Sequence, residues 1–187
     1  HSGLEARGAA RAAHNARMFP ADVAALITNA AGCGSAMKDQ HGGALVQDVA
    51  EFLDALGLRT AHALPEPTLV AYHDACHLSH GQGIRAAPRR LLQQVAHLTL
   101  VELADNEMCC GSAGLYNLEQ PATAAALGAR KAAAVAATGA ALVATGNIGC
   151  ITQIEAHLAL PVRHTIEVLD STYSPQGTQG EPRASHG

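Results

Sequence analysis

The chain has 187 residues, of which 48% are hydrophobic and 3% aromatic, and 12 Lys and Arg stand against 16 Asp and Glu for a formal charge of -4. This length suits one ordinary domain or two small ones. The slightly acidic balance, without any basic run, argues against a nucleic-acid-binding surface or a patch for anionic membranes.

The N-terminal segment, residues 4–15, has a helical pattern already under way, and the chain opens on His1 rather than Met. We therefore expect a C-terminal fragment of a longer protein. Residues 1–19 carry arginines throughout and lack the apolar region of a secretory signal. The 23 uncharged residues between Lys131 and Glu155 contain Gly, Asn and Gln, which favour helix, strand and loop over a membrane span. These features predict a protein of the reducing cytoplasm.

Short apolar or β-branched runs alternate with helical patterns along the rest of the chain. The predicted strands are residues 24–28, 68–72, 98–102, 141–145 and 161–164. The predicted helices are residues 44–56, 85–95, 120–138 and 165–169, the third with Pro121 in its first turn. This alternation predicts an α/β fold with a parallel, doubly wound, Rossmann-like sheet, in which functional sites gather at the carboxyl ends of strands.

A weak internal repeat relates residues 26–33 to residues 143–150, since each reads as a strand, a turn of small residues and then Gly-Cys. The second copy has cysteines upstream, whereas the first has none before it. We expect duplicated cysteine-rich half-units of which the first is truncated, with residues 1–60 as its C-terminal part and residues 61–173 as the second repeat. Residues 174–187 contain no apolar side chain larger than Pro or Ala, which predicts a disordered tail.

All five cysteines lie in or near loops that follow predicted strands. They are Cys33, Cys76, Cys109, Cys110 and Cys150. In a reducing compartment such residues are more often ligands, catalytic thiols or core residues than disulfides, and core cysteines have no reason to follow strand ends. The last four could converge from three loops and supply the soft, anionic donors that a cubane iron-sulfur cluster needs.

The vicinal pair Cys109-Cys110 is the sharpest signal. Neighbouring side chains in an extended segment point apart, so two adjacent ligands require a special turn or two different metal atoms. Gly111 and Gly114 follow the pair and would let backbone N–H groups approach cluster sulfurs. The following helix would then point its positive end at an anionic centre.

These motifs resemble the cysteine-rich CCG domain, which is found in heterodisulfide reductase, lactate-utilisation proteins, anaerobic glycerol-3-phosphate dehydrogenase and the glycolate oxidase iron-sulfur subunit. The similarity is strongest to the last and covers essentially residues 1–172. It rests on five segments in matching order and spacing, which are residues 29–34, 72–78, 108–116, 147–150 and 162–167.

The resemblance implies an iron-sulfur electron-transfer subunit of a glycolate oxidase (dehydrogenase) complex. FAD would lie in partner flavoprotein subunits that oxidise glycolate to glyoxylate, and electrons would pass to a membrane acceptor. Through that complex the chain would lie peripherally at the inner face of the plasma membrane. The cysteines at 76, 109, 110 and 150 would hold a [4Fe-4S] cluster, and Cys33 would serve the truncated repeat.

The sequence departs from the family pattern at one position. The pattern ends in Cys-x-x-Cys, and here Asn147 takes the place of the first cysteine. Four thiolates remain, enough for one ordinary cluster rather than a non-cubane double cluster. We expect Asn147 to lie near the cluster as a non-thiolate substitute, and Gly149 to give the backbone access to the sulfurs.

Alternatives with other chemistry remain open. A lactate-utilisation or heterodisulfide-reductase-like complex would use the same thiols. A structural zinc site would combine them with His73, His77 or His80. A cysteine hydrolase would use Cys110 or Cys76 as a nucleophile, activated by His73 or His77 and oriented by Asp74.

Overall fold

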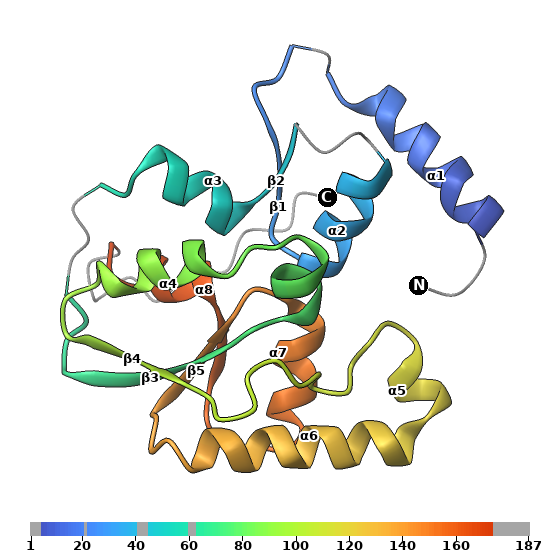
Figure 1. Ribbon diagram of the computed structural model, residues 1–187. Coiled ribbons are helices and arrows are strands. Elements are labelled where there is room, and N and C mark those ends of the chain that lie inside the picture. Colours follow the sequence, from blue (N-terminus) through green and yellow to red (C-terminus); the bar gives the residue numbers. More distant parts are fainter. Residues whose placement is uncertain (1–4, 21, 41–44, 60–62, 174–187) are drawn as a thin grey trace, which may run out of the picture.

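The computed structural model describes residues 5–20, 22–40, 45–59 and 63–173, so the tail expected at residues 174–187 lies outside the described residues. In chain order the elements are α1 Glu5–Met18, β1 Leu26–Thr28, α2 Ala31–Gln40, β2 Val46–Asp48, α3 Val49–Leu56, β3 Thr68–His73, the π-helical turn η1 His77–Gly81, α4 Ala86–Gln93, β4 Leu98–Glu102, α5 Tyr116–Glu119, α6 Pro121–Ala136, β5 Leu142–Thr145, α7 Ile148–Glu155, β6 Val162–His164 and α8 Thr165–Asp170. Their arrangement is shown in Figure 1.

The strands form two parallel sheets, a pair β1-β2 and a four-stranded sheet of order β4-β3-β5-β6. The predicted parallel, doubly wound α/β fold is therefore confirmed. The chain leaves β3 toward β4 on one side and then continues to β5 and β6 on the other. The crevice at the carboxyl ends of β3 and β5 is consequently the switch point of the sheet, the usual place for a ligand in such folds.

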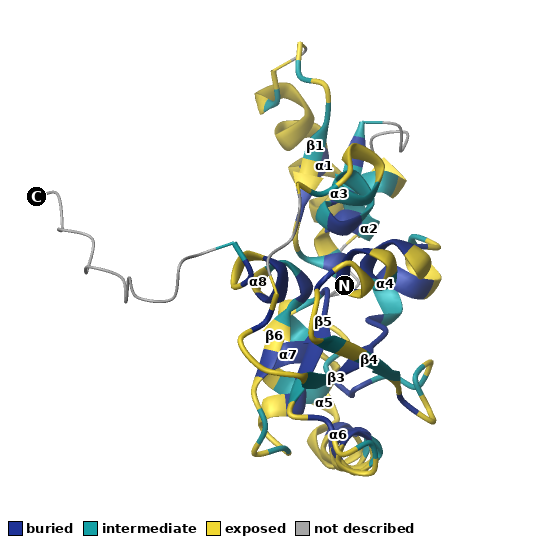
Figure 2. Ribbon diagram, turned by 90° about the vertical axis from the view of Figure 1, so that its left-hand side faces the viewer, coloured by how far each residue is buried: buried dark blue, intermediate teal, exposed yellow. Residues whose placement is uncertain are grey.

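Helices cover both faces of the four-stranded sheet (Figure 2). Because strand side chains alternate, Val70 and Tyr72 of β3 pack with α4 and α8, whereas Ala71 packs with α6 and α7. Residues 70–73 are each at most 1% exposed, as expected for the central strand of a parallel sheet. Helix α1, by contrast, buries only Ala12. The sheet and its flanking helices form the core that supports the loops after β3, β4 and β5.

Most of the predicted elements are present within a few residues of their expected bounds, and Pro121 begins α6 as expected. The helix predicted over residues 44–56 is wrong in its first part, where Val46–Asp48 forms β2. Asp48 ends that strand and caps α3, because its side chain accepts from the backbone N of Ala50 and Glu51 completes a capping box. Residue 44 itself lies outside the described residues.

The repeat detected in the sequence corresponds to two similar strand-helix units. Cys33 is the third residue of α2, which follows β1, and Cys150 is the third residue of α7, which follows β5. Both cysteines, expected in or near loops, therefore lie in first helical turns. The two units meet where the backbone N of Ala31 donates to the carbonyl of Gly146 at 3.2 Å. Among the described residues, no helix combines the length and apolar character required to cross a bilayer.

Candidate metal centre

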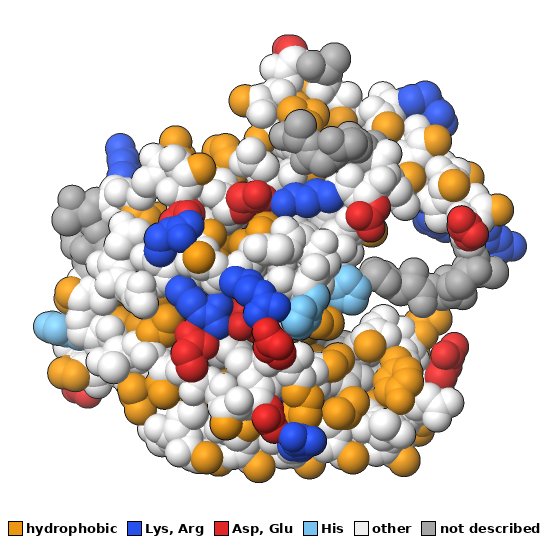
Figure 3. All heavy atoms as spheres, in the orientation of Figure 1, with side chains coloured by type: hydrophobic (Ala, Val, Ile, Leu, Met, Phe, Trp, Pro, Cys, Tyr) orange, Lys and Arg blue, Asp and Glu red, His pale blue; other side chains and the backbone are white. Residues whose placement is uncertain are grey.

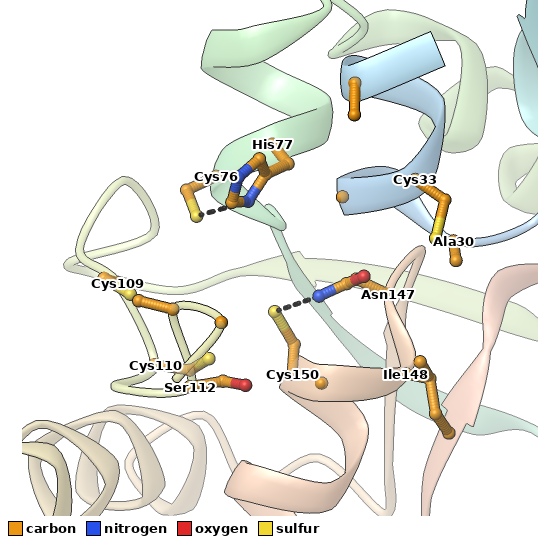
Figure 4. Close-up of a pocket in the computed structure, with 15 residues that line it drawn as sticks. Ala30, Cys33, Cys76, His77, Cys109, Cys110, Ser112, Asn147, Ile148 and Cys150 are labelled. Carbon is orange, nitrogen blue, oxygen red and sulfur yellow. Dashed lines mark hydrogen bonds between the residues drawn. The ribbon is translucent and has the colours of Figure 1, made fainter. Parts of the chain in front are cut away.

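All five cysteines line a single cavity of about 340 Å³ at the carboxyl ends of the strands (Figure 4). Cys76 lies between β3 and η1, and Cys109 and Cys110 lie in the loop between β4 and α5. Cys110 and Cys150 are buried, Cys76 and Cys109 are partly exposed, and Cys33 is exposed. Figure 4 shows Cys33 on α2, across the cavity from the vicinal pair. The cavity therefore has a buried sulfur floor and a more open side.

Four of the thiols form a continuous chain of contacts. Cys76 contacts Cys109, Cys109 contacts Cys110, and Cys110 contacts Cys150. Three loops distant in the sequence thus bring four sulfur atoms to one place. The described residues include no other group of sulfur donors of this kind.

The thiols divide into two with lowered and two with raised pKa. Hydrogen bonds from Cys110 and Cys76 lower the pKa of Cys109 to about 2, and a hydrogen bond from Cys110 lowers the pKa of Cys150 well below its ordinary value. The pKa of Cys76 and of Cys110 is raised, in each case first by the hydrogen bond with Cys109. Two sulfurs keep their protons because four adjacent anions would repel one another. A bound cation would displace those protons.

Gly111 makes the turn that directs both cysteines of the vicinal pair into the cavity. Its φ is +97°, in the region that disfavours side chains, and a Cβ there would lie 2.5 Å from the carbonyl O of Ala124. Its backbone N donates to Sγ of Cys109 at 3.3 Å. The helix that follows the pair, α5, begins only at Tyr116, so the helix N-termini beside the cavity are those of α2 and α7.

The first turn of α7 approaches this loop closely at Gly149, where a Cβ would lie 2.7 Å from Oγ of Ser112. Asn147 precedes the helix, and its Nδ2 donates to Sγ of Cys150 at 3.5 Å instead of capping α7 (Figure 4). Asn147, Gly149 and Gly114 all line the cavity. The structure thus brings every glycine and amide named from the sequence to the thiol site.

His73, the last residue of β3, lies beneath the thiols. One of its ring nitrogens and the sulfurs of Cys110 and Cys150 are all within 4.8 Å of one another. The side chain is 1% exposed, and neither ring nitrogen has a hydrogen-bond partner of normal geometry among the described residues. Buried polar atoms are rarely left unsatisfied, so these nitrogens require an explanation.

The other residues of the hydrolase alternative are placed differently. Nδ1 of His77 lies 3.6 Å from Sγ of Cys76. The carboxylate of Asp74 is bound by Arg89 at 2.7 Å, so it is already engaged with a guanidinium. The helix expected directly after Cys110 in a nucleophile elbow is absent from the described residues 111–115. This arrangement gives little support to a Ser-His-Asp type of relay built on a cysteine.

A band of ion pairs surrounds the outer side of the site. On the face shown in Figure 3, basic and acidic side chains alternate over α4 and the end of β4. The pairs are Arg85 with Glu107, Arg89 with Asp74 and Glu102, and Arg90 with Asp54. Asn106 extends the band inward, since it accepts from the backbone N of Asp74 at 2.8 Å and donates to Glu102 at 2.9 Å. These contacts connect the loop of Cys76 to the loop of Cys109.

Lys131 of α6 is fully buried below the same loop, which sequence reasoning did not predict. Its Nζ donates to the carbonyl O of Asp105 at 2.6 Å and of Asn106 at 3.4 Å. Burial lowers the pKa of Lys131, whereas the nearby cysteines raise it. Buried lysines are rare unless paired. The available signal was a single lysine within a helix made mostly of alanine.

Comparison with known proteins identifies a family for part of the chain. Residues 70–155 match the cysteine-rich domain family designated CCG. The matched range begins in β3 and ends at the end of α7. It contains the four contacting thiols, His73 and Lys131.

Three relatives extend the similarity over most of the chain. The probable glycolate oxidase iron-sulfur subunit of Bacillus subtilis is 36% identical over 172 residues, covering 83% of this chain and 39% of the relative. One of the fumarate reductase (CoM/CoB) subunits of Methanothermobacter marburgensis is 34% identical, covering 80% and 32%. The glycolate oxidase iron-sulfur subunit of Escherichia coli is 29% identical, covering 91% and 46%. The chain thus spans less than half the length of these relatives.

Proposed function

Residues 70–155 belong to the cysteine-rich CCG domain family, and on this premise we propose that the chain is an iron-sulfur electron-transfer unit. Cys76, Cys109, Cys110 and Cys150 would hold one [4Fe-4S] cluster. The supporting observation is the unbroken chain of sulfur contacts among these four residues from three loops. Soft thiolate donors in this number suit iron-sulfur chemistry.

The bound cluster would accept and donate single electrons at a potential set by nearby charges and hydrogen bonds. The protein's own groups would tune that potential. The backbone N–H of Gly111 and the amide of Asn147 already donate to cysteine sulfurs, and such bonds stabilise negative charge on sulfur. Sheet and helices would exclude water from the floor, where Cys110 and Cys150 are buried.

We further propose that the parent complex is a glycolate oxidase, as the Bacillus subtilis and Escherichia coli relatives are named. FAD in partner flavoprotein subunits would take electrons from glycolate, and this chain would relay them toward a membrane acceptor. Peripheral attachment through the complex would keep the chain at the inner face of the plasma membrane. Cys33 would serve a second cysteine-rich repeat. A lactate-utilisation or heterodisulfide-reductase-like complex is the competing assignment.

Anaerobic reconstitution with iron and sulfide tests the cluster. We expect broad visible absorption, an electron paramagnetic resonance signal after reduction, and about four iron and four sulfide per cluster. Cys110→Ser should lose the cluster, whereas Cys33→Ser should keep it at this site. A colourless protein with one zinc, or a hydrolytic activity lost on alkylation of one thiol, would overturn the proposal.

The parent complex is tested separately. Glycolate, added with the flavoprotein subunits, should reduce the cluster faster than lactate does. Faster reduction by lactate would reassign the substrate while leaving the electron-transfer role intact.

A further inference from the structure

We propose that His73 is a further ligand of this centre and binds iron through an imidazole nitrogen. The inference rests on the proposed iron-sulfur function and adds a nitrogen donor to the four sulfur donors. Imidazole is a common ligand for iron and replaces cysteine in some iron-sulfur centres.

Burial first sets His73 apart. The side chain is 1% exposed, and among the described residues neither ring nitrogen has a hydrogen-bond partner of normal geometry. Leaving a buried polar atom unsatisfied costs about 1–3 kcal/mol. A metal ion at the thiols would satisfy one nitrogen directly and remove most of that cost.

Position places the same ring against the thiols. A ring nitrogen of His73 shares a sphere of 4.8 Å with the sulfurs of Cys110 and Cys150, the two most buried thiols. The backbone that carries the ring is held rigidly, because His73 pairs with Thr145 in the central β3-β5 ladder. The nitrogen therefore faces the sulfur floor from the sheet, opposite the open side of the cavity.

Charge also favours a neutral donor at this place. Asn147 stands where the related sequences' pattern has a fifth cysteine, and its amide donates to Cys150, so it contributes no donor electron pair through that nitrogen. A neutral imidazole would add a donor without adding negative charge to a site already crowded with thiolates. Such replacement of thiolate by imidazole raises the reduction potential of a centre.

His77 is the natural control, because it also lies in the cavity wall but its Nδ1 lies against the partly exposed thiol of Cys76 at 3.6 Å. His77 is therefore placed to interact with a ligand side chain rather than to occupy the floor. Substituting each histidine separately distinguishes the two positions.

The test is pulsed electron paramagnetic resonance of the reconstituted, reduced protein, prepared with histidine at natural abundance and with histidine labelled with ¹⁵N. We expect a nitrogen hyperfine coupling that changes on labelling, is lost in His73→Leu and is kept in His77→Leu. The labelled natural protein gives this readout even if His73→Leu does not fold.

Two results overturn the inference. A cluster with full iron content whose spectrum does not respond to histidine labelling would leave the proposed function standing and remove His73 from the ligands. A coupling that survives in His73→Leu and disappears in His77→Leu would assign the nitrogen to the other ring. Failure to take up iron and sulfide would instead overturn the proposed function and this inference together.

Discussion

Two parallel hydrogen bonds join Arg89 to Asp74, with Nη1 donating to Oδ1 at 3.0 Å and Nη2 to Oδ2 at 2.7 Å. The same guanidinium binds both carboxylate oxygens of Glu102, at 2.6 and 2.7 Å. Asp74 lies just before Cys76, and Glu102 ends the strand that leads to Cys109. One planar side chain therefore fixes the separation of two thiol-bearing loops, a role that lysine could not fill in the same way.

Arg89→Met should lower the free energy of unfolding by about 3 kcal/mol, because it leaves the 6% exposed Asp74 without its ionic partner. It should also lower the iron content after reconstitution, since the two loops lose their common anchor. Urea denaturation and iron analysis measure the two effects. Arg90→Met on the same helix removes an exposed pair with Asp54 and should change neither. Equal effects of the two variants would contradict this role for Arg89.

Lys131→Met should lower the reduction potential of the cluster by on the order of 50 mV, because it removes a buried positive charge that favours the reduced, more negative state. Potentiometric titration followed by electron paramagnetic resonance gives the shift. Arg130→Met changes the neighbouring, 65% exposed cation and should leave the potential almost unchanged. An unchanged potential in Lys131→Met would show that its charge is not sensed by the cluster.

Gly111→Ala should destabilise the fold by at least about 2 kcal/mol and reduce cluster content, because it combines a disfavoured φ with a clash against Ala124. Gly139→Ala is matched to it, with φ +70° and no atom within 4 Å of the added Cβ. That control should cost only about 1 kcal/mol and keep the cluster. Similar losses in both variants would mean that the close approach to α6 is unimportant.

Asp48 makes stability depend on pH. Burial raises its pKa from 3.8 to about 6, with smaller opposing effects from Ala50, Lys38 and, in the same direction as burial, Glu51. The folded state therefore binds this proton more tightly than the unfolded chain, and the stabilisation present below about pH 4 is lost as the pH rises through 6. The loss amounts to roughly 3 kcal/mol at full ionisation.

Asp48→Asn keeps a side chain that can cap α3 but cannot ionise. We expect it to be more stable than the natural protein at pH 8, and nearly equal to it at pH 4. Urea denaturation at the two pH values measures the difference. A variant that is destabilised equally at both would show that the carboxyl group matters only as a cap.

The sequence permitted prediction of the sheet because the alternation of apolar runs and helical patterns is a property of whole segments. Strands β3, β4 and β5 are long enough for this pattern to be visible, whereas β2 has three residues and merged with the helical spacing of α3. The first turns of α2 and α7 were interpreted as turns because both contain glycine next to cysteine. Small residues there allow close helix contacts, which a local pattern cannot distinguish from a turn.

The meeting of the thiols followed from one topological rule, since residues after parallel strands share an edge of the sheet. Neighbouring contacts did not follow from it. The burial of Lys131 depends on how α6 lies under the loop after β4, and the Arg89 contacts depend on the length of α4. His73 was considered only for zinc and for a hydrolase, because its position in the strand gives no indication that the ring lies beneath two sulfurs.

The unequal exposure of the five cysteines gives the cavity a direction. Cys110 and Cys150 rest against the sheet, while Cys33 and Ile148 border the side that solvent reaches. An electron donor and dioxygen would thus approach a reduced centre through the same doorway. A partner protein seated there would shorten the path for electron tunnelling and at the same time shield the iron from oxidative damage.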